Sequence, residues 1–96
     1  MVHEMQFESP VVLEGKEYSG LTLDFSRVTG LTLIECERRF KQETGGAVEV
    51  ALNDYRYVSL VAGEAAGMAV ELIRALPAPY FIAAMLHVQS FLLSAS

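Results

Sequence analysis

The fold is decided within residues 21–36, LTLDFSRVTGLTLIEC, where one hydrophobic period gives way to another. Apolar and polar side chains first alternate, which places Leu21, Leu23 and Phe25 on one face and is typical of a half-buried β-strand. From Thr32 the apolar residues recur at the spacing of an α-helix. The sequence therefore predicts an α+β fold, mainly α-helical, in which an N-terminal β-hairpin is followed by three to four helices.

The hairpin is predicted over about residues 5–25. Residues 11–13 are apolar and mostly β-branched, and the following Glu14-Gly15-Lys16 offers a turn in which glycine can adopt a positive φ. Pro10 cannot donate a hydrogen bond to a partner strand, so we expect it at a strand end or at an exposed edge.

The first helix has recognisable start and stop signals. Thr32 and Glu35 have the spacing of a capping box, with the threonine as N-cap, and Leu31 with Cys36 has the spacing of a hydrophobic staple. Gly45-Gly46 then ends the helix, because glycine is the usual residue after a helix C-terminus. The helical part of the domain is therefore expected over about residues 32–94, within a single domain covering residues 1–96.

A second helix is predicted from Asp54, with Asn53 as its cap. Gly67 lies inside its apolar stripe and predicts a kink or a break, followed by a short helix over about residues 69–75. The stripe consists of Val58, Val61, Ala62, Ala65, Ala69, Leu72, Ile73 and Leu76. Pro77-Ala78-Pro79 ends this region.

Gly63 and Gly67 are four residues apart among alanines, which leaves a nearly bare helix surface. Another backbone can approach such a surface closely. The approaching segment is either another part of the same chain or a partner, and the spacing itself does not decide between them.

The last helix, from Tyr80 to about Leu93, is apolar around much of its circumference. Two separate stripes follow it, one of Phe81, Met85, Val88 and Leu92 and another of Ile82, Leu86 and Leu93. A helix of this kind must be buried on more than one side. In a domain of 96 residues that indicates a partner, and the residues predicted to bind it are Phe81, Ile82, Met85, Leu86 and Leu93.

The charge balance argues against nucleic acid as that partner. Twelve acidic and seven basic residues give a net charge of −5, which repels a phosphate backbone. The basic cluster of Arg38, Arg39 and Lys41 is offset by Glu35 and Glu37 at helical spacings of four, so it reads as a solvated helix face. A membrane span is not expected either, because the apolar C-terminal stretch is shorter than about 20 residues.

The sequence offers no set of residues for catalysis or metal binding. His3 and His87 are isolated in the sequence, and Cys36 is the single cysteine, so no metal-ligand spacing is recognisable. Phosphate-binding glycine loops and a nucleophile elbow are also missing. We expect no enzyme activity, no catalytic residue, no metal and no cofactor.

The order of these features resembles the tail assembly chaperones of tailed bacteriophages and prophages. The resemblance rests on the turn at Glu14–Tyr18, the strand at residues 21–26, the alanine-rich helix ending at Gly67, and Leu76-Pro77 before a terminal helix. It covers residues 11–93.

The resemblance implies a chaperone that self-associates, coats the tape measure protein and is displaced as tail tube subunits polymerise. Such a protein acts in the cytoplasm of the bacterial host and is not expected in the mature virion. The alternative from another functional class is a small dimerising adaptor or regulator unrelated to phage tails.

Overall fold

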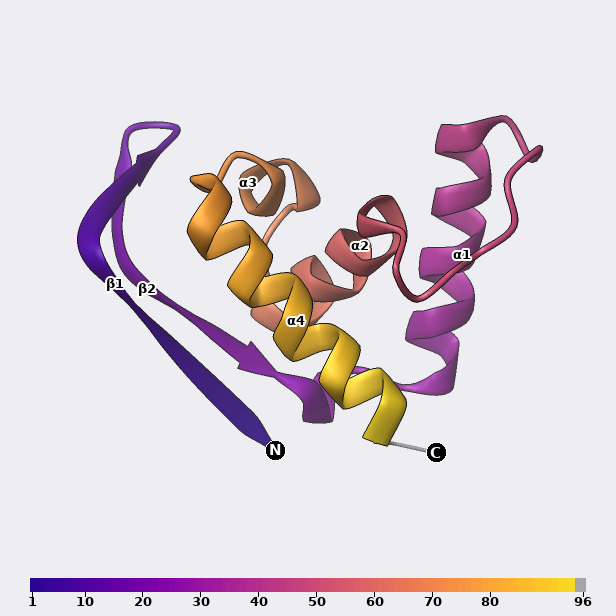
Figure 1. Cartoon of the computed structure of the whole chain (residues 1–96), viewed down its shortest axis with the longest axis horizontal. Helices are drawn as coiled ribbons and strands as arrows, with labels where there is room; N and C mark the ends of the chain where they lie inside the picture. Colours follow the sequence, from indigo (N-terminus) through magenta and orange to yellow (C-terminus); the bar gives the residue numbers. More distant parts are fainter. Residues whose placement is uncertain (95–96) are drawn as a thin grey trace.

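The structure is a computed structural model that describes residues 1–94, and it places an antiparallel β-hairpin beside a group of helices (Figure 1). The elements in chain order are β1 (Val2–Leu13), β2 (Lys16–Asp24), the 3-10 turn η1 (Phe25–Arg27), α1 (Gly30–Thr44), α2 (Tyr55–Ala66), α3 (Val70–Arg74) and α4 (Ala78–Ser94). This arrangement confirms the prediction of a mainly helical α+β fold.

The hairpin turns at Glu14 and Gly15, as predicted. Both residues have positive φ angles, 51° and 79°, the combination that matches the twist of two strands joined by a two-residue loop. β1 begins earlier than expected, at Val2, because residues 2–6 continue the pairing with β2. Pro10 lies within β1 and not at its end, but the strand register is irregular between Gln6 and Val11, so its missing N–H group interrupts no regular ladder.

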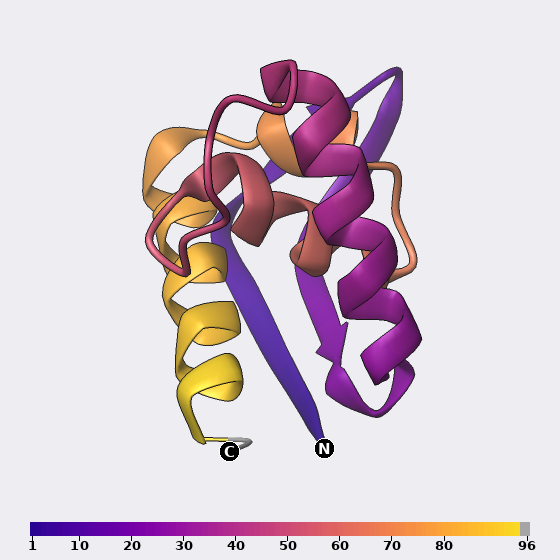
Figure 2. The same cartoon turned by 90° about the vertical axis from the view of Figure 1, so that its right-hand side faces the viewer.

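Helix α2 lies at the centre of the molecule and packs against β2, α1, α3 and α4 (Figures 1 and 2). Its middle turns are buried on nearly every side. The inward-facing strand residues Leu21, Leu23 and Phe25 are buried, and so are Cys36 and Phe40 of α1. Of the predicted stripe, Leu72 is half-buried and Ala69 is exposed, whereas the buried members are Val58, Val61, Ala62, Ala65, Ile73 and Leu76.

Helix α1 begins at Gly30, which corrects the predicted start. Thr29 is the N-cap: its hydroxyl accepts a hydrogen bond from the Thr32 N–H group (N–O 3.3 Å), and the Thr32 hydroxyl accepts one from the Thr29 N–H group (3.0 Å). The capping box therefore joins two threonines, because each hydroxyl accepts a hydrogen bond from the other residue's backbone N–H group. Glu35, predicted at the third position, forms an ion pair with Arg38 instead.

Other details of α1 divide between correct and wrong predictions. Leu31 is 80% exposed, so the staple with Cys36 is wrong. The predicted pair of Glu37 and Lys41 is present (3.3 Å). The helix ends at Gly45, whose φ of 72° places it in the left-handed region as predicted.

The starts of α2 and α4 differ from the predicted starts by one and two residues. Asp54, and not Asn53, caps α2, because its carboxylate accepts from the Arg56 N–H group (3.0 Å) and is also bound by the Arg56 guanidinium group. Helix α4 includes Ala78 and Pro79, since N–H groups in the first turn have no acceptor within the helix. Of the kink or break predicted at Gly67, the structure has the break: Gly67 follows the last residue of α2 with a φ of 66°.

Candidate partner-binding surface

Helix α4 presents one side to the core and contains no Asp, Glu, Lys or Arg. Its residues Ala84, Met85 and Val88 are completely buried, and the helix packs mainly against α2. A helix without charged side chains has no means of solvating its outer face other than through its few polar residues. Its outer face is therefore the first place to look for a function.

The outer face of α4 carries Ile82, Leu86 and Leu93, which we call the outer strip. Their exposed fractions are 44%, 56% and 65%. The spacing of four and seven residues aligns them along one side of the helix, away from the buried stripe. Several aliphatic side chains thus lie in a row on the surface.

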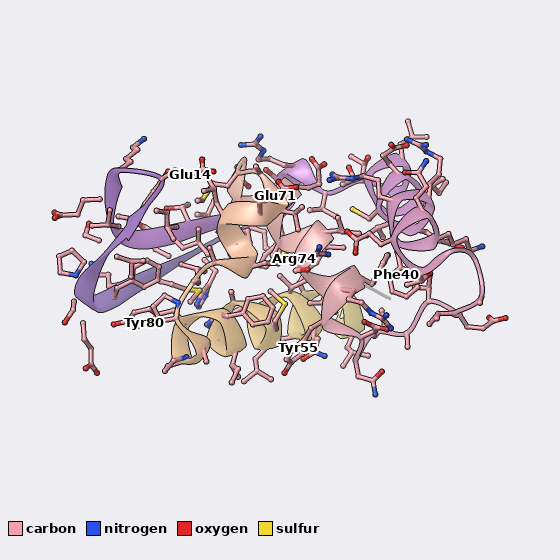
Figure 3. The ribbon with its side chains drawn as sticks, turned by 90° about the horizontal axis from the view of Figure 1, so that it is seen from above. Glu14, Phe40, Tyr55, Glu71, Arg74 and Tyr80 are labelled. Atoms are coloured by element: carbon pink, nitrogen blue, oxygen red, sulfur yellow. The ribbon has the colours of Figure 1, made fainter. Side chains whose placement is uncertain are left out.

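The loop before α2 and the first residue of that helix widen the outer strip into a patch. Leu52 and Tyr55 are exposed, and the Tyr55 ring meets the half-buried Phe81 ring edge-on, with 5.6 Å between centroids. Figure 3 labels Tyr55. The Gln89 side-chain amide donates to the Leu52 carbonyl (2.8 Å), which fixes the loop against α4. We use the name α4 patch for Leu52, Tyr55 and the outer strip together.

Two of the five predicted partner-binding residues lie elsewhere than expected. Met85 is completely buried, because it belongs to the stripe that faces α2, so the conformation described here does not present it to a partner. Phe81 is half-buried and reaches the surface only beside Tyr55. Leu52 and Tyr55 were missed, since nothing in the sequence places the loop before α2 against a helix about 30 residues further on.

The paired glycines serve contacts within the chain. A Cβ atom added at Gly63 would lie 2.9 Å from the Met68 carbonyl oxygen, so the segment after α2 folds back closely over this glycine. A Cβ atom added at Gly67 would clash with the guanidinium group of Arg27. Of the two interpretations left open by the sequence, packing within the chain holds at both positions.

A polar network at the junction of three helices was not predicted. Arg74 forms an ion pair with Glu43 (3.0 Å), donates from Nε to the buried Ser59 hydroxyl (2.9 Å) and donates from Nη2 to the Arg56 carbonyl (2.9 Å). Figure 3 labels Arg74 near the middle of the molecule. The network stabilises the junction of α1, α2 and α3, and its partners are too distant in sequence for a spacing rule to find them.

Cys36 and His87 do not meet as a nucleophile and a base. Burial, with a smaller contribution from the charge of Glu64, raises the pKa of the Cys36 thiol to about 11, so the thiol is protonated at neutral pH. His87 lies instead beside His3, with ring centroids 3.7 Å apart. Within residues 1–94, no group of three or more His, Cys, Asp or Glu side chains could hold a metal ion.

The described part of the chain also contains no helix whose length and apolar character would let it cross a membrane. Comparison with known proteins adds no assignment. No protein-family model matches the chain, and neither does any curated protein or solved structure.

Proposed function

We propose that this protein is a non-enzymatic tail assembly chaperone of a tailed bacteriophage or prophage. It self-associates and binds the tape measure protein and tail tube subunits during tail morphogenesis, in the cytoplasm of the host, and it leaves before the virion is complete. The observation that supports this proposal best is the α4 patch, a row of exposed aliphatic side chains on a helix without charges.

The geometry of the patch suits a helical partner. Ile82, Leu86 and Leu93 follow the spacing by which one amphipathic helix packs against another. Each side chain buried on binding contributes about 1.5–3 kcal/mol before the cost of ordering the partners is subtracted. A few such contacts give weak, exchangeable binding, which is what a chaperone needs if a polymerising subunit is to displace it.

The rest of the surface supports the same role. With a net charge of −5, copies of the chain repel each other at long range, and this repulsion keeps a protein with an apolar patch soluble. The protonated, buried Cys36 thiol favours function through a surface over function through covalent chemistry.

The test is co-expression with a tape measure protein encoded in the same genomic neighbourhood, followed by co-purification. Leu86→Asp places a charge in the middle of the α4 patch and should abolish co-purification. Arg38→Ala combined with Arg39→Ala should leave it unchanged, because these side chains lie on α1.

Ile34→Asp is the matched control. Ile34 is as exposed as Leu86, at 64% against 56%, but it lies on α1 outside the patch. Retained binding by the Ile34 variant together with loss of binding by the Leu86 variant supports the proposal. An essential arginine pair with a dispensable Leu86 would show an electrostatic contact and contradict it, and a genomic neighbourhood without tail genes would favour the adaptor alternative.

A further inference from the structure

Three pairs of rings join the N-terminal part of the chain to α4. Each pair takes one ring from the same side of that helix, where Tyr80, His87 and Phe91 succeed each other at spacings of seven and four residues. The distances between centroids are 4.4 Å for Phe7 and Tyr80, 3.7 Å for His3 and His87, and 4.4 Å for Phe25 and Phe91.

The middle pair differs from the other two because it can become charged near neutral pH. His3 lies on the inward face of β1, in alternation with the buried Met5 and Phe7, and pairs with Leu23 of β2. Phenylalanine and tyrosine rings stay neutral in weak acid, whereas both imidazole rings can each take up a proton there.

We propose that the His3–His87 pair is an acid-sensitive latch between β1 and α4. When both rings are neutral they pack like the aromatic pairs on either side. When both carry a proton, two positive charges lie within about 4 Å of each other, a distance at which like charges repel even near the protein surface. The repulsion loosens β1 from α4 and uncovers the apolar surface between them.

Charged groups on the neighbouring elements do not neutralise the pair. Helix α4 has no acidic residue, and Glu4 of β1 belongs to the opposite, outward face of the strand. Asp24 at the end of β2 accepts hydrogen bonds from both the N–H and the hydroxyl of Ser26. Those hydrogen bonds, chiefly the one from the hydroxyl, lower the pKa of Asp24, with smaller contributions from the positive charges at the Met1 amino group and Arg27.

The charged side chains of η1 and α2 make contacts with other groups. The Arg27 guanidinium group lies over Gly67, Arg56 is paired with Asp54, and Glu64 acts on Cys36. The pKa of His87 is lowered first by burial and then by the charge of His3, and no carboxylate contributes to this shift. His87 therefore resists taking up a proton for as long as the contact with His3 persists.

The direction of the pH dependence follows from the lowered pKa. Between the folded and unfolded pKa values the unfolded or opened state binds more protons, so acid favours it. Stabilisation by the neutral pair is complete above the ordinary histidine pKa of about 6.5 and is lost as the pH falls below that value. The latch does not depend on the proposed tail function or on any partner.

Hydrogen exchange of the isolated full-length protein, corrected for intrinsic rates, tests the latch at about pH 7.5 and about pH 5. In the wild type we expect the protection of β1 to fall at the lower pH, about tenfold for each unit by which the pKa of His87 is lowered. The protection of α2 should change little, because the ring contact joins β1 to α4. His87→Phe keeps a ring without a charge and should give equal β1 protection at both values.

His3→Phe provides the reciprocal variant at an exposed position and should behave in the same way. Tyr80→Phe alters a neighbouring ring pair without removing a histidine, so its β1 protection should remain pH-dependent. Three results would overturn the latch: wild-type β1 protection that is independent of pH, an unchanged acid response in both histidine variants, or parallel loss of protection in α2, which would indicate global unfolding.

Discussion

One guanidinium group, that of Arg74, connects three helices at the level of single residues. The planar fork reaches Glu43 at the end of α1 and, at the same time, the Ser59 hydroxyl and the Arg56 carbonyl of α2. Ser59 is completely buried, and in the described part of the chain no buried side-chain nitrogen or oxygen lacks a hydrogen-bond partner. A lysine has neither the fork nor the fixed angles needed to make these contacts together.

Replacing Arg74 by methionine should lower the free energy of unfolding by about 1.5–3 kcal/mol, the range for a hydrogen bond to a charged group, because the Ser59 hydroxyl and the Arg56 carbonyl lose this donor and keep only the bond between them. Urea denaturation followed by circular dichroism measures it. Arg38→Met is the control: its ion pair with Glu35 is exposed to solvent, so its loss should lower the stability less than the loss of Arg74. Equal losses in the two variants would show that the Arg74 contacts do not hold the helices together.

Two helical glycines with different surroundings allow a test at the level of elements. Both lie in helices, where alanine is favoured over glycine by about 0.4–1 kcal/mol. Around Gly30, at the start of α1, an added Cβ would meet nothing within 4 Å. At Gly63 in α2 it would lie 2.9 Å from a backbone oxygen, which cannot move without shifting the start of α3.

Gly30→Ala should therefore stabilise the protein slightly, whereas Gly63→Ala should destabilise it by about 1–3 kcal/mol through overcrowding. Thermal and urea unfolding of the two variants in parallel decide this. A stabilising Gly63→Ala would mean that α2 and the following segment do not approach each other as closely as the structure describes.

The ends of elements were more predictable than their beginnings, for a physical reason. A left-handed φ strongly favours glycine, so Gly15, Gly45 and Gly67 each indicated a turn or a helix end, and each adopts a positive φ. A helix can begin at any of several polar residues. Whether Thr29 or Thr32 becomes the N-cap depends on which hydroxyl the chain presents to the free N–H groups, and spacing does not reveal that.

Within the α4 patch and its surroundings, the sequence could not predict the contacts between distant elements. The exposed row of Ile82 and Leu86 follows from helical periodicity within one element. The Tyr55 and Phe81 ring contact, the Gln89 hydrogen bond to Leu52, and the pairing of His3 with His87 require the tertiary arrangement. Met85 was predicted to bind a partner although its stripe faces the core, because two apolar stripes on one helix look alike until the core is placed.

For the whole molecule, the α4 patch on an acidic surface predicts reversible self-association. Leu86→Glu should shift sedimentation toward the monomer, and Ile34→Glu, which adds the same charge at a similarly exposed position on α1, should not. Added salt should strengthen association, since it screens repulsion between copies that each carry −5 charges. A strict monomer at high micromolar concentration, or equal effects of both variants, would contradict this prediction.

The contact of β1 with α4 also constrains how the chain folds as it is synthesised. The Ser9 backbone N–H group donates to the Tyr80 hydroxyl, 71 positions away, and the Phe25 ring stacks on the ring of Phe91 in α4. The hairpin leaves the ribosome early and α2 can cover β2, yet the part of its apolar side that packs against α4 stays open until that helix has emerged. Long-range closure of this kind slows folding and leaves nascent chains open to aggregation. Such a chain gains from fast translation of its last third, or from a ribosome-bound holdase that occupies the hairpin until α4 arrives.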